Sequence, residues 1–382
     1  MKKNNNLKTL APELALVADS LINIGGAEMS FLALTKIFKQ AHLYSLLFDP
    51  KIKTFQAIKP KLKSVFSNKT YGFIKKKSKY SLPFLAIATE TLDLSNYDLV
   101  ISSSSAFSKS LITKPDTVHF CYCHSPMRFA WDYTHEYLKE LKLGRIRDLL
   151  AKVILNYLRV WDQASADRVD YFIANSQATR AKIKKYYRRS SRVIYPPAAL
   201  NPKKIDLKSC HDFKRSYFLI VSRLSAYKKI DIAIHAFNKL NWPLKVVGQG
   251  PEYQKLKKIA GSNVEILGFQ TRSNLFKLYQ NCSVYVQPCE EDFGIAAVEA
   301  MSFGKPVLAY RAGGALETVI AGETGEFFDS ITAEVIAEGA YRIKQKLSSY
   351  NPKSIQNQAQ NFSFSKFQKQ INQYIFSKYS NH

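Results

Sequence analysis

The sequence is short of acidic residues. Its 382 residues include 56 Lys and Arg but only 30 Asp and Glu, so the formal net charge is +26 at pH 7. Such an excess indicates an anionic partner, which could be nucleic acid, an anionic lipid surface or a phosphorylated substrate. A lysine-rich surface that serves no particular partner is the alternative.

Long apolar runs and paired cysteines are also missing. No run approaches the roughly 20 apolar residues of a membrane-spanning helix, and the N-terminal residues do not have the pattern of a signal peptide. The cysteines are odd in number, and their spacing matches no zinc pattern: Cys121, Cys123, Cys210, Cys282 and Cys289. They predict free thiols in a reducing cytoplasm and no metal site.

Apolar and aromatic residues are plentiful, with 46% hydrophobic residues, 24 Phe and 22 Tyr. A chain of this length and composition is globular and long enough for two domains. Short strand-like runs alternate with helical patterns almost throughout, which predicts an α/β fold with parallel sheets. The expected strands begin near residues 14, 97, 118, 169, 217, 243, 263, 282, 305 and 325.

The rhythm breaks at Pro196-Pro197 and restarts at residue 217, which predicts two similar α/β domains. We place the first at residues 1–198 and the second at 199–358. The tail, 359–382, carries Phe367, Ile371, Tyr374 and Ile375 at helical spacing, and this pattern predicts a docking helix.

Two loops of the second half carry candidate ligand groups. "VSRLSAYKKIDIAI" places Arg223 and Lys228 between a strand and a helix, which makes either an anion site or a solvated basic loop. "VVGQGPE" places Gly248 and Gly250 after the next strand. They either let the backbone approach a ligand or make a tight turn, and the third glycine of a dinucleotide fingerprint is missing.

The stretch "EEDFGIAAVEAMSFG" (290–304) combines carboxylates with a turn into a short helix. The turn at Gly294 would leave backbone N–H groups free for a phosphate or sugar oxygen. Glu299 lies about one and a half turns into that helix, where a buried carboxylate needs hydrogen-bond partners. A ribose diol would suit it, and a backbone turn or an Arg is the alternative. Glu291 could reach another part of the same ligand.

The stretch "CYCHSPMRFAWD" places His124 just after a strand, at the sheet edge where ligands bind in open α/β folds. A substrate contact and a structural histidine are equally compatible with this position. A metal cluster of Cys121, Cys123 and His124 is disfavoured because no fourth ligand is near in sequence.

Taken in order, these stretches resemble the family 4 retaining glycosyltransferases of GT-B fold. The resemblance includes "GGAE" after the first strand, "CHSPMRFAWD", "ANSQATRAKI", "SRLSAYKKIDIAI", "VVGQGPE", "LGF" and "EEDFGIAAVEAMSFGKPVLAYRAGGALETV". The last stretch contains the paired glutamates of the family, Glu291 and Glu299. "CHSPMRFAWD" and "GGALETV" look most like the subgroup that adds mannose in bacterial surface polysaccharide (O-antigen-like) synthesis.

The resemblance implies two Rossmann-like domains with a cleft between them, an acceptor-binding first domain, a donor-binding second domain and a C-terminal helix that crosses back to the first. It implies that Arg223 and Lys228 bind the donor diphosphate, Glu291 faces the donor sugar, His124 contacts the transferred sugar and Glu299 holds the ribose. Further donor contacts are implied at Gly25, Gly26, Gly248, Gly250, Gly268, Phe293, Gly294 and Ile295.

The same resemblance implies a metal-independent enzyme with a nucleotide-sugar substrate and no cofactor. GDP-mannose is favoured as the donor, and the acceptor would be a glycan or a polyprenyl-diphosphate-linked oligosaccharide. A UDP-sugar-dependent transferase of hexose or N-acetylhexosamine is the alternative, since Ala296 and Ala297 stand where many relatives carry bulkier residues.

Residues 51–80 contain ten Lys and no acidic residue, interleaved with Phe55, Phe66, Tyr71, Phe73 and Tyr80. This mixture predicts docking on an anionic membrane surface, with Lys75, Lys76 and Lys77 as the candidates, at the inner face of the cytoplasmic membrane. Nucleic-acid binding would also explain the charge, but no recognised nucleic-acid module is visible, so we expect no nucleic-acid partner.

Overall fold

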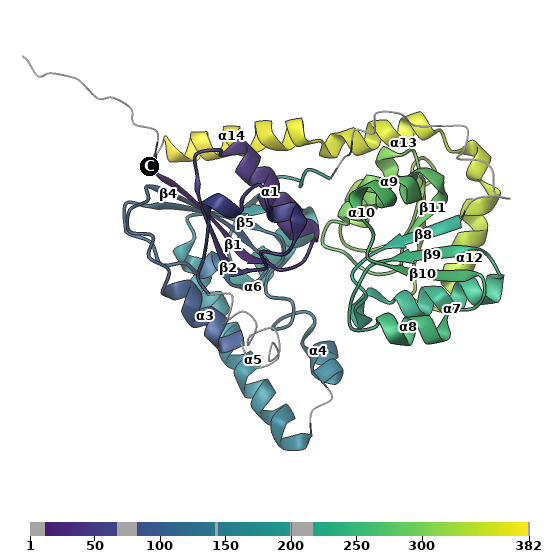
Figure 1. The fold of residues 1–382 in the computed structure, drawn as a ribbon, viewed down its shortest axis with the longest axis horizontal. Coiled ribbons are helices and arrows are strands. Elements are labelled where there is room, and N and C mark those ends of the chain that lie inside the picture. Colours follow the sequence, from purple (N-terminus) through teal and green to yellow (C-terminus); the bar gives the residue numbers. More distant parts are fainter. Residues whose placement is uncertain (1–11, 67–81, 142–143, 199, 201–216, 381–382) are drawn as a thin grey trace, which may run out of the picture.

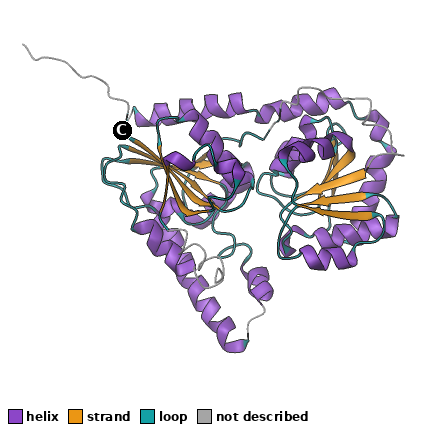
Figure 2. Cartoon of the chain, viewed as in Figure 1, coloured by secondary structure: helices purple, strands orange, loops and turns teal. Residues whose placement is uncertain are grey.

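The computed structural model describes residues 12–66, 82–141, 144–198, 200 and 217–380. These residues form two parallel β-sheets, each covered by helices on both faces (Figures 1 and 2). The predicted α/β class with two Rossmann-like domains is confirmed. Helix α14 joins the first domain although it ends the chain, as Figure 1 shows.

The first sheet has seven strands in the order β3-β2-β1-β4-β5-β6-β7, and every pairing is parallel. Its strands are β1 (Leu14–Leu21), β2 (His42–Phe48), β3 (Leu62–Ser64), β4 (Leu99–Ser104), β5 (Val118–Cys123), β6 (Tyr171–Ala174) and β7 (Ser191–Val193). Its helices are α1 (Gly26–Ile37), α3 (Leu82–Glu90), α4 (Thr134–Leu141), α5 (Arg145–Ser165) and α6 (Gln177–Tyr187).

The second sheet has six strands in the order β10-β9-β8-β11-β12-β13. Its strands are β8 (Tyr217–Val221), β9 (Leu244–Val247), β10 (Val264–Gly268), β11 (Cys282–Gln287), β12 (Val307–Tyr310) and β13 (Gly325–Phe328). The later helices are α7 (Ile230–Leu240), α8 (Tyr253–Ile259), α9 (Arg272–Asn281), α10 (Ile295–Ser302), α11 (Ala315–Thr318), α12 (Ala333–Gln345), α13 (Pro352–Ala359) and α14 (Phe364–Tyr379).

All ten expected strands are present. The sequence patterns did not predict the strands β2, β3 and β7 or the helices α3 and α5. In the centre of the first sheet, β4 and β5 are buried along their whole length, as strands covered on both faces are. Their polar side chains pair with each other, since Ser102 Oγ lies 2.8 Å from His119 Nε2. His119 therefore has a structural role.

Helix α14 is the docking helix that the tail pattern predicts. Phe367, Ile371 and Ile375 are buried in the core of the first domain. The rings of Phe367 and Tyr122 meet edge to face with centroids 5.7 Å apart. Helix α13 packs instead on α10 of the second domain, so the segment from α13 to α14 spans both domains (Figure 1).

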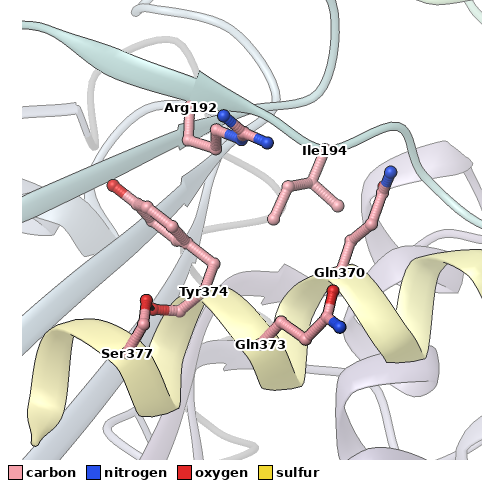
Figure 3. A pocket seen from close by; sticks show the side chains of 6 residues that line it. All are labelled: Arg192, Ile194, Gln370, Gln373, Tyr374 and Ser377. Atoms are coloured by element: carbon pink, nitrogen blue, oxygen red, sulfur yellow. Dashed lines mark hydrogen bonds between the residues drawn. The ribbon is translucent and has the colours of Figure 1, made fainter.

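A small hollow of about 290 Å³ lies at the seam between α14 and β7 (Figure 3). It is lined by Arg192, Ile194, Gln370, Gln373, Tyr374 and Ser377. None of these residues belongs to the groups that the sequence predicts for the site.

Four cysteines among the described residues are buried and form no disulfide: Cys121, Cys123, Cys282 and Cys289. Cys210 lies outside the described residues. No helix within the described ranges is both long enough and apolar enough to cross a membrane.

Candidate active site

The two domains meet where helices α1 and α10 begin. Figure 1 shows these helices facing each other between the two sheets. A Cβ on Gly26 would lie only 2.8 Å from Cδ1 of Ile295, so glycine allows the two helix starts to touch. Because each helix start presents unbonded N–H groups and a partial positive charge, this junction suits an anionic ligand. The predicted donor residues Gly25, Gly26, Gly294 and Ile295 are thus brought together.

Lys228 and Glu291 form an ion pair beside this junction. Lys228 ends the short 3₁₀ turn after β8, and its ammonium donates to a carboxylate oxygen of Glu291. The Lys228 side chain is 9% exposed and that of Glu291 is 25% exposed. Burial alone would lower the pKa of Lys228, but Glu291 outweighs it and the pKa rises. Lys228 is therefore a fixed, buried cation. The sequence alone left open whether its loop is an anion site or a solvated basic loop.

Arg223 lies in the same loop and is exposed. Two glycines hold this loop against the next one. Gly248 has a φ of +147°, and a Cβ there would lie 1.8 Å from the carbonyl oxygen of Ser222. A Cβ on Gly250 would lie 2.2 Å from the carbonyl oxygen of Leu224. Close backbone packing requires glycine at both positions, which agrees with the prediction of a tight turn. The two glycines also position the loop that carries Arg223.

A third loop fixes the stretch before α10. Gly314 N donates to the carbonyl of Glu291 at 2.8 Å, and a Cβ on Gly314 would lie 2.3 Å from Cα of Phe293. Gly294 has a φ of +87° and caps α10, whose first internal bond runs from Ala297 N to the Gly294 carbonyl at 3.1 Å. The turn at Phe293 to Ile295 is thus rigid, and its amides precede the first bonded turn of the helix.

Glu299 is buried, as predicted, but protein groups already bond to it. Arg272 Nη1 donates to one oxygen at 2.9 Å and Tyr279 Oη to the other at 2.9 Å. Burial raises the pKa of Glu299, and these two donors act against that rise. Bonds from Arg272 and Tyr279 therefore explain the burial of this carboxylate without a ribose, as in the alternative in which an Arg is its partner. A carboxylate has about four acceptor sites, so capacity for a diol remains.

Asp292 is a residue whose position the sequence did not explain. It is 8% exposed and lies in the second domain, but its partners are in the first. Arg128 donates to it from Nε at 3.0 Å and Nη2 at 2.5 Å, and Lys182 from Nζ at 2.8 Å. Burial would raise the pKa of Asp292, but these two cations lower it. Asp292 thus joins the two domains next to Glu291, a role that no local sequence pattern indicated.

His124 is buried directly behind this ion cluster. Its Nε2 lies 2.8 Å from Ser103 Oγ, and burial lowers its pKa to about 4 although Asp292 acts to raise it. The imidazole is therefore neutral at physiological pH. The structure shows that His124 is 7% exposed and has a structural partner, so its predicted contact with the transferred sugar stays a prediction.

Glu28 at the start of α1 was not singled out, although it belongs to the quoted "GGAE" stretch. Burial raises the pKa of Glu28 to about 7. Hydrogen bonds from the backbone N–H groups of Glu28 and Gly25, and the charge of Arg223 across the junction, partly oppose this rise. Its neighbour Asp19 is occupied by the amides that follow β4, including Ser105 N at 2.5 Å and Ala106 N at 2.7 Å. Glu28 is therefore the titratable group that the first domain adds to this site.

The remaining predicted residues are less central. Gly268 ends β10 with a φ of +66°, and its carbonyl accepts from Gly248 N at 2.9 Å. The candidates Lys75, Lys76 and Lys77 lie outside the described residues. Phe55 is fully buried in the first core, so its predicted exposure to a membrane is wrong. Within the described ranges, no group of three or more His, Cys, Asp or Glu is arranged to hold a metal ion.

Comparison with known proteins places this geometry in context. Residues 24–201 match the sequence model of Glycosyltransferase Family 4, and residues 203–361 match that of Glycosyl transferases group 1. Among solved structures, HepE of Anabaena in complex with UDP-glucose superposes with a TM-score of 0.69 at 18% identity, over 96% of this chain and 100% of that chain.

Two curated relatives match shorter stretches. The alpha-1,3/1,6-mannosyltransferase ALG2 of Saccharomyces cerevisiae is 25% identical over 262 residues, 55% of this chain and 50% of the relative. The GtfA subunit of the UDP-N-acetylglucosamine–peptide N-acetylglucosaminyltransferase of Streptococcus agalactiae is 29% identical over 159 residues, 38% of this chain and 31% of the relative.

These matches span at most about half the length of either relative. The two family models, by contrast, follow one another along nearly the whole chain and divide it between the two sheets. Both halves of the chain thus match glycosyltransferase models, and the chain is a glycosyltransferase with the two-domain GT-B fold.

Proposed function

We propose that the chain transfers a sugar from a nucleoside diphosphate donor, with retention of anomeric configuration, and that mannose from GDP-mannose is the favoured donor. The observation that carries the proposal is the buried Lys228–Glu291 pair at the junction of the α1 and α10 helix starts. Both family matches and the relative that acts as a mannosyltransferase support it.

The proposed mechanism uses fixed charge and not a metal. Arg223, Lys228 and the amides of Phe293, Gly294 and Ile295 would stabilise the departing nucleoside diphosphate, because preorganised donors in a closed site cost no reorganisation during the reaction. Glu291 would orient Lys228 and the donor sugar. Attack by the acceptor on the face that the leaving group vacates would retain the configuration.

The nucleoside would lie on the second domain. Glu299 would accept from the ribose hydroxyls while it keeps the bonds from Arg272 and Tyr279. Gly248, Gly250 and Gly268 would flank the base. The donor would thus be held mainly by the second domain, and Gly25 and Gly26 of the first domain would approach its diphosphate.

We propose a glycan or polyprenyl-diphosphate-linked acceptor, in surface polysaccharide (O-antigen-like) synthesis at the cytoplasmic face of a membrane. A lipid-linked acceptor requires the enzyme to work at an anionic surface, which fits the net charge of +26. The second candidate donor is a UDP-sugar. It is favoured by the solved relative with UDP-glucose and by the relative that uses UDP-N-acetylglucosamine.

Thermal unfolding with a panel of sugar nucleotides tests the proposal. GDP-mannose is expected to raise the unfolding temperature more than UDP-glucose or UDP-N-acetylglucosamine does, because a ligand that binds only the native state stabilises it. Oligonucleotides are expected to have no such effect. A larger shift with a UDP-sugar would replace the favoured donor by the second candidate. Absence of any shift would contradict the donor site.

Two variants separate the roles of the paired glutamates. Glu299→Ala is expected to weaken binding of the free nucleotide. Glu291→Ala is expected to reduce turnover more than nucleotide binding, and turnover of the parent is expected to persist in a chelator of divalent cations. Glu290→Ala is the control, since that side chain is about half exposed and lies 3.9 Å from Lys182. Equal activity of all three variants with the parent would refute the assignment.

A further inference from the structure

Helix α5 exposes a continuous apolar stripe. Seven of its large apolar side chains are between 39% and 79% exposed: Ile146, Leu149, Leu150, Val153, Ile154, Tyr157 and Val160. Their spacing of three and four residues places them along one side of the helix. Scattered exposed apolar residues are ordinary, but a contiguous apolar surface marks a place of interaction.

This stripe is not the face by which α5 packs on its own domain. Leu155, Leu158, Asp162 and Ser165 are buried and form the inward face. Leu158 belongs to the same apolar cluster as Leu85 of α3. Figure 1 shows α5 running outward from the first sheet, with its first residues furthest from the body of the domain. The buried contacts therefore come from the second half of the helix, and the apolar stripe is not used by the fold.

Basic residues follow one flank of the stripe. Arg145, Lys152 and Arg159 recur every seven residues, so they lie on one line along the helix. Asp148, which pairs with Lys152 at 2.8 Å, is the acidic residue near this line. The other acid of α5, Asp162, is buried and paired with Lys109 at 3.0 Å. An exposed apolar stripe with a cationic flank is the arrangement of helices that lie in a lipid interface.

Helix α3 lies beside α5 (Figure 1) and also exposes apolar side chains. Its Phe84 and Ile87 are 64% and 59% exposed. Trp161 Nε1 of α5 donates to Glu90 Oε1 of α3 at 2.9 Å, which holds the two helices together. Figure 1 shows α3 beside the inner part of α5. The two helices are thus held together as a unit.

We propose that α5, supported by α3, docks the protein on an anionic lipid bilayer, with the apolar stripe in the interface and its basic flank at the headgroups. The charge argues for lipid over a second copy of the chain. A two-fold contact through the stripe would bring two basic flanks close together, in a chain of net charge +26. The lipid-linked acceptor of the proposed function is the reason to expect a membrane partner. Lipid binding itself does not require sugar transfer, so the two can be tested separately.

Sedimentation with vesicles tests the proposal on the full-length protein. The parent is expected to sediment with vesicles of phosphatidylglycerol and phosphatidylcholine in equal parts, less with phosphatidylcholine alone, and less at high salt. The variant Leu150→Gln/Val153→Gln/Val160→Gln is expected to bind the anionic vesicles at least about tenfold more weakly, because three apolar side chains leave the interface. These side chains are 57%, 59% and 62% exposed, so the fold should tolerate the change.

The matched control is Ile112→Gln/Tyr341→Gln/Phe376→Gln. It removes three apolar side chains that are 51%, 54% and 58% exposed but belong to neither α5 nor α3, and parental vesicle binding is expected. Parental binding by the α5 variant would overturn the proposal, as would equal binding of the parent to neutral vesicles. A parental dimer that the α5 variant abolishes, without vesicle binding, would overturn it in favour of a second copy. Thermal shifts with sugar nucleotides, measured on every variant, report the donor site separately.

Discussion

The two domains share one architecture, but they differ in where they place charged and apolar side chains. The second domain turns charge inward, toward the junction, where Lys228, Glu291 and Glu299 are held by short ion pairs and hydrogen bonds. The first domain contributes glycines, a neutral His124 and the titrating Glu28 to the same junction. Away from the junction it exposes the apolar stripe of α5.

This contrast shows how one fold can serve two ligands. Fixed cations and helix starts in the second domain suit a charged, water-soluble donor. In the first domain, Arg128 and Lys182 at the junction are paired with Asp292, and the apolar outer helix suits the proposed acceptor attached to lipid. Asp292 joins these two halves, because its carboxylate belongs to the second domain and its partners Arg128 and Lys182 to the first.

The largest expected effect is the loss of the buried cation of the second domain. Lys228→Ala should lower turnover by about 10²- to 10³-fold, since a preorganised charge at the leaving group is removed. Steady-state kinetics with the best donor of the panel measures it. The control is Lys239→Ala, whose ammonium pairs with Glu334 on the exposed surface. A loss below tenfold for Lys228→Ala would remove this residue from the mechanism.

The packing between two loops of the second domain can be disrupted by a substitution at one glycine. Gly248→Ala should lower the free energy of unfolding by about 3 kcal/mol, because the Cβ would collide with the Ser222 carbonyl and the residue would be forced into a positive φ. Gly144→Ala is the matched control, since a Cβ there meets nothing within 4 Å. Denaturant unfolding of both variants gives the comparison. Equal stability would show that the two loops can move apart at little cost.

The joint between the domains can be weakened by removing one charge. Asp292→Asn keeps the shape of the side chain but removes the charge that neutralises Arg128 and Lys182. We expect a more open protein by small-angle X-ray scattering and turnover lowered about tenfold, since closure assembles the site. Glu290→Gln should leave both unchanged. A compact Asp292→Asn protein with full activity would show that other contacts hold the domains together.

The smallest effect concerns pH and the first domain. Glu28, with a pKa of about 7, is mostly neutral below pH 7 and anionic above it. An anionic Glu28 near a diphosphate repels it, so the affinity for intact GDP-mannose should fall a few-fold as the pH rises from 6 to 8. Titration calorimetry of parent and Glu28→Gln checks this sign. A Glu28→Gln protein that keeps the full pH dependence would assign it to another group.

Much of the fold could be predicted because its elements have clear periods. The buried strands of the second domain are short apolar runs between turn residues, and α14 repeats Phe367, Ile371 and Ile375 at helical spacing. Helix α5 was not predicted although its apolar residues recur every three and four positions from Ile146 to Val160, a helical period that the sequence shows directly. Phe55 was misjudged because an aromatic residue between lysines can be exposed or buried, and only packing distinguishes the two.

The sequence by itself determined the two-domain α/β fold, because the fold depends on local periodicity, and the order of its motifs carried the resemblance that singles out Glu291 and Glu299. Only the tertiary structure decided which charges meet. Asp292 lies 110 residues from Lys182 and 164 from Arg128 along the chain, and Lys228 meets Glu291 across 63 residues. No local pattern encodes such pairs, since they form only when distant loops converge at one edge of the packed sheets.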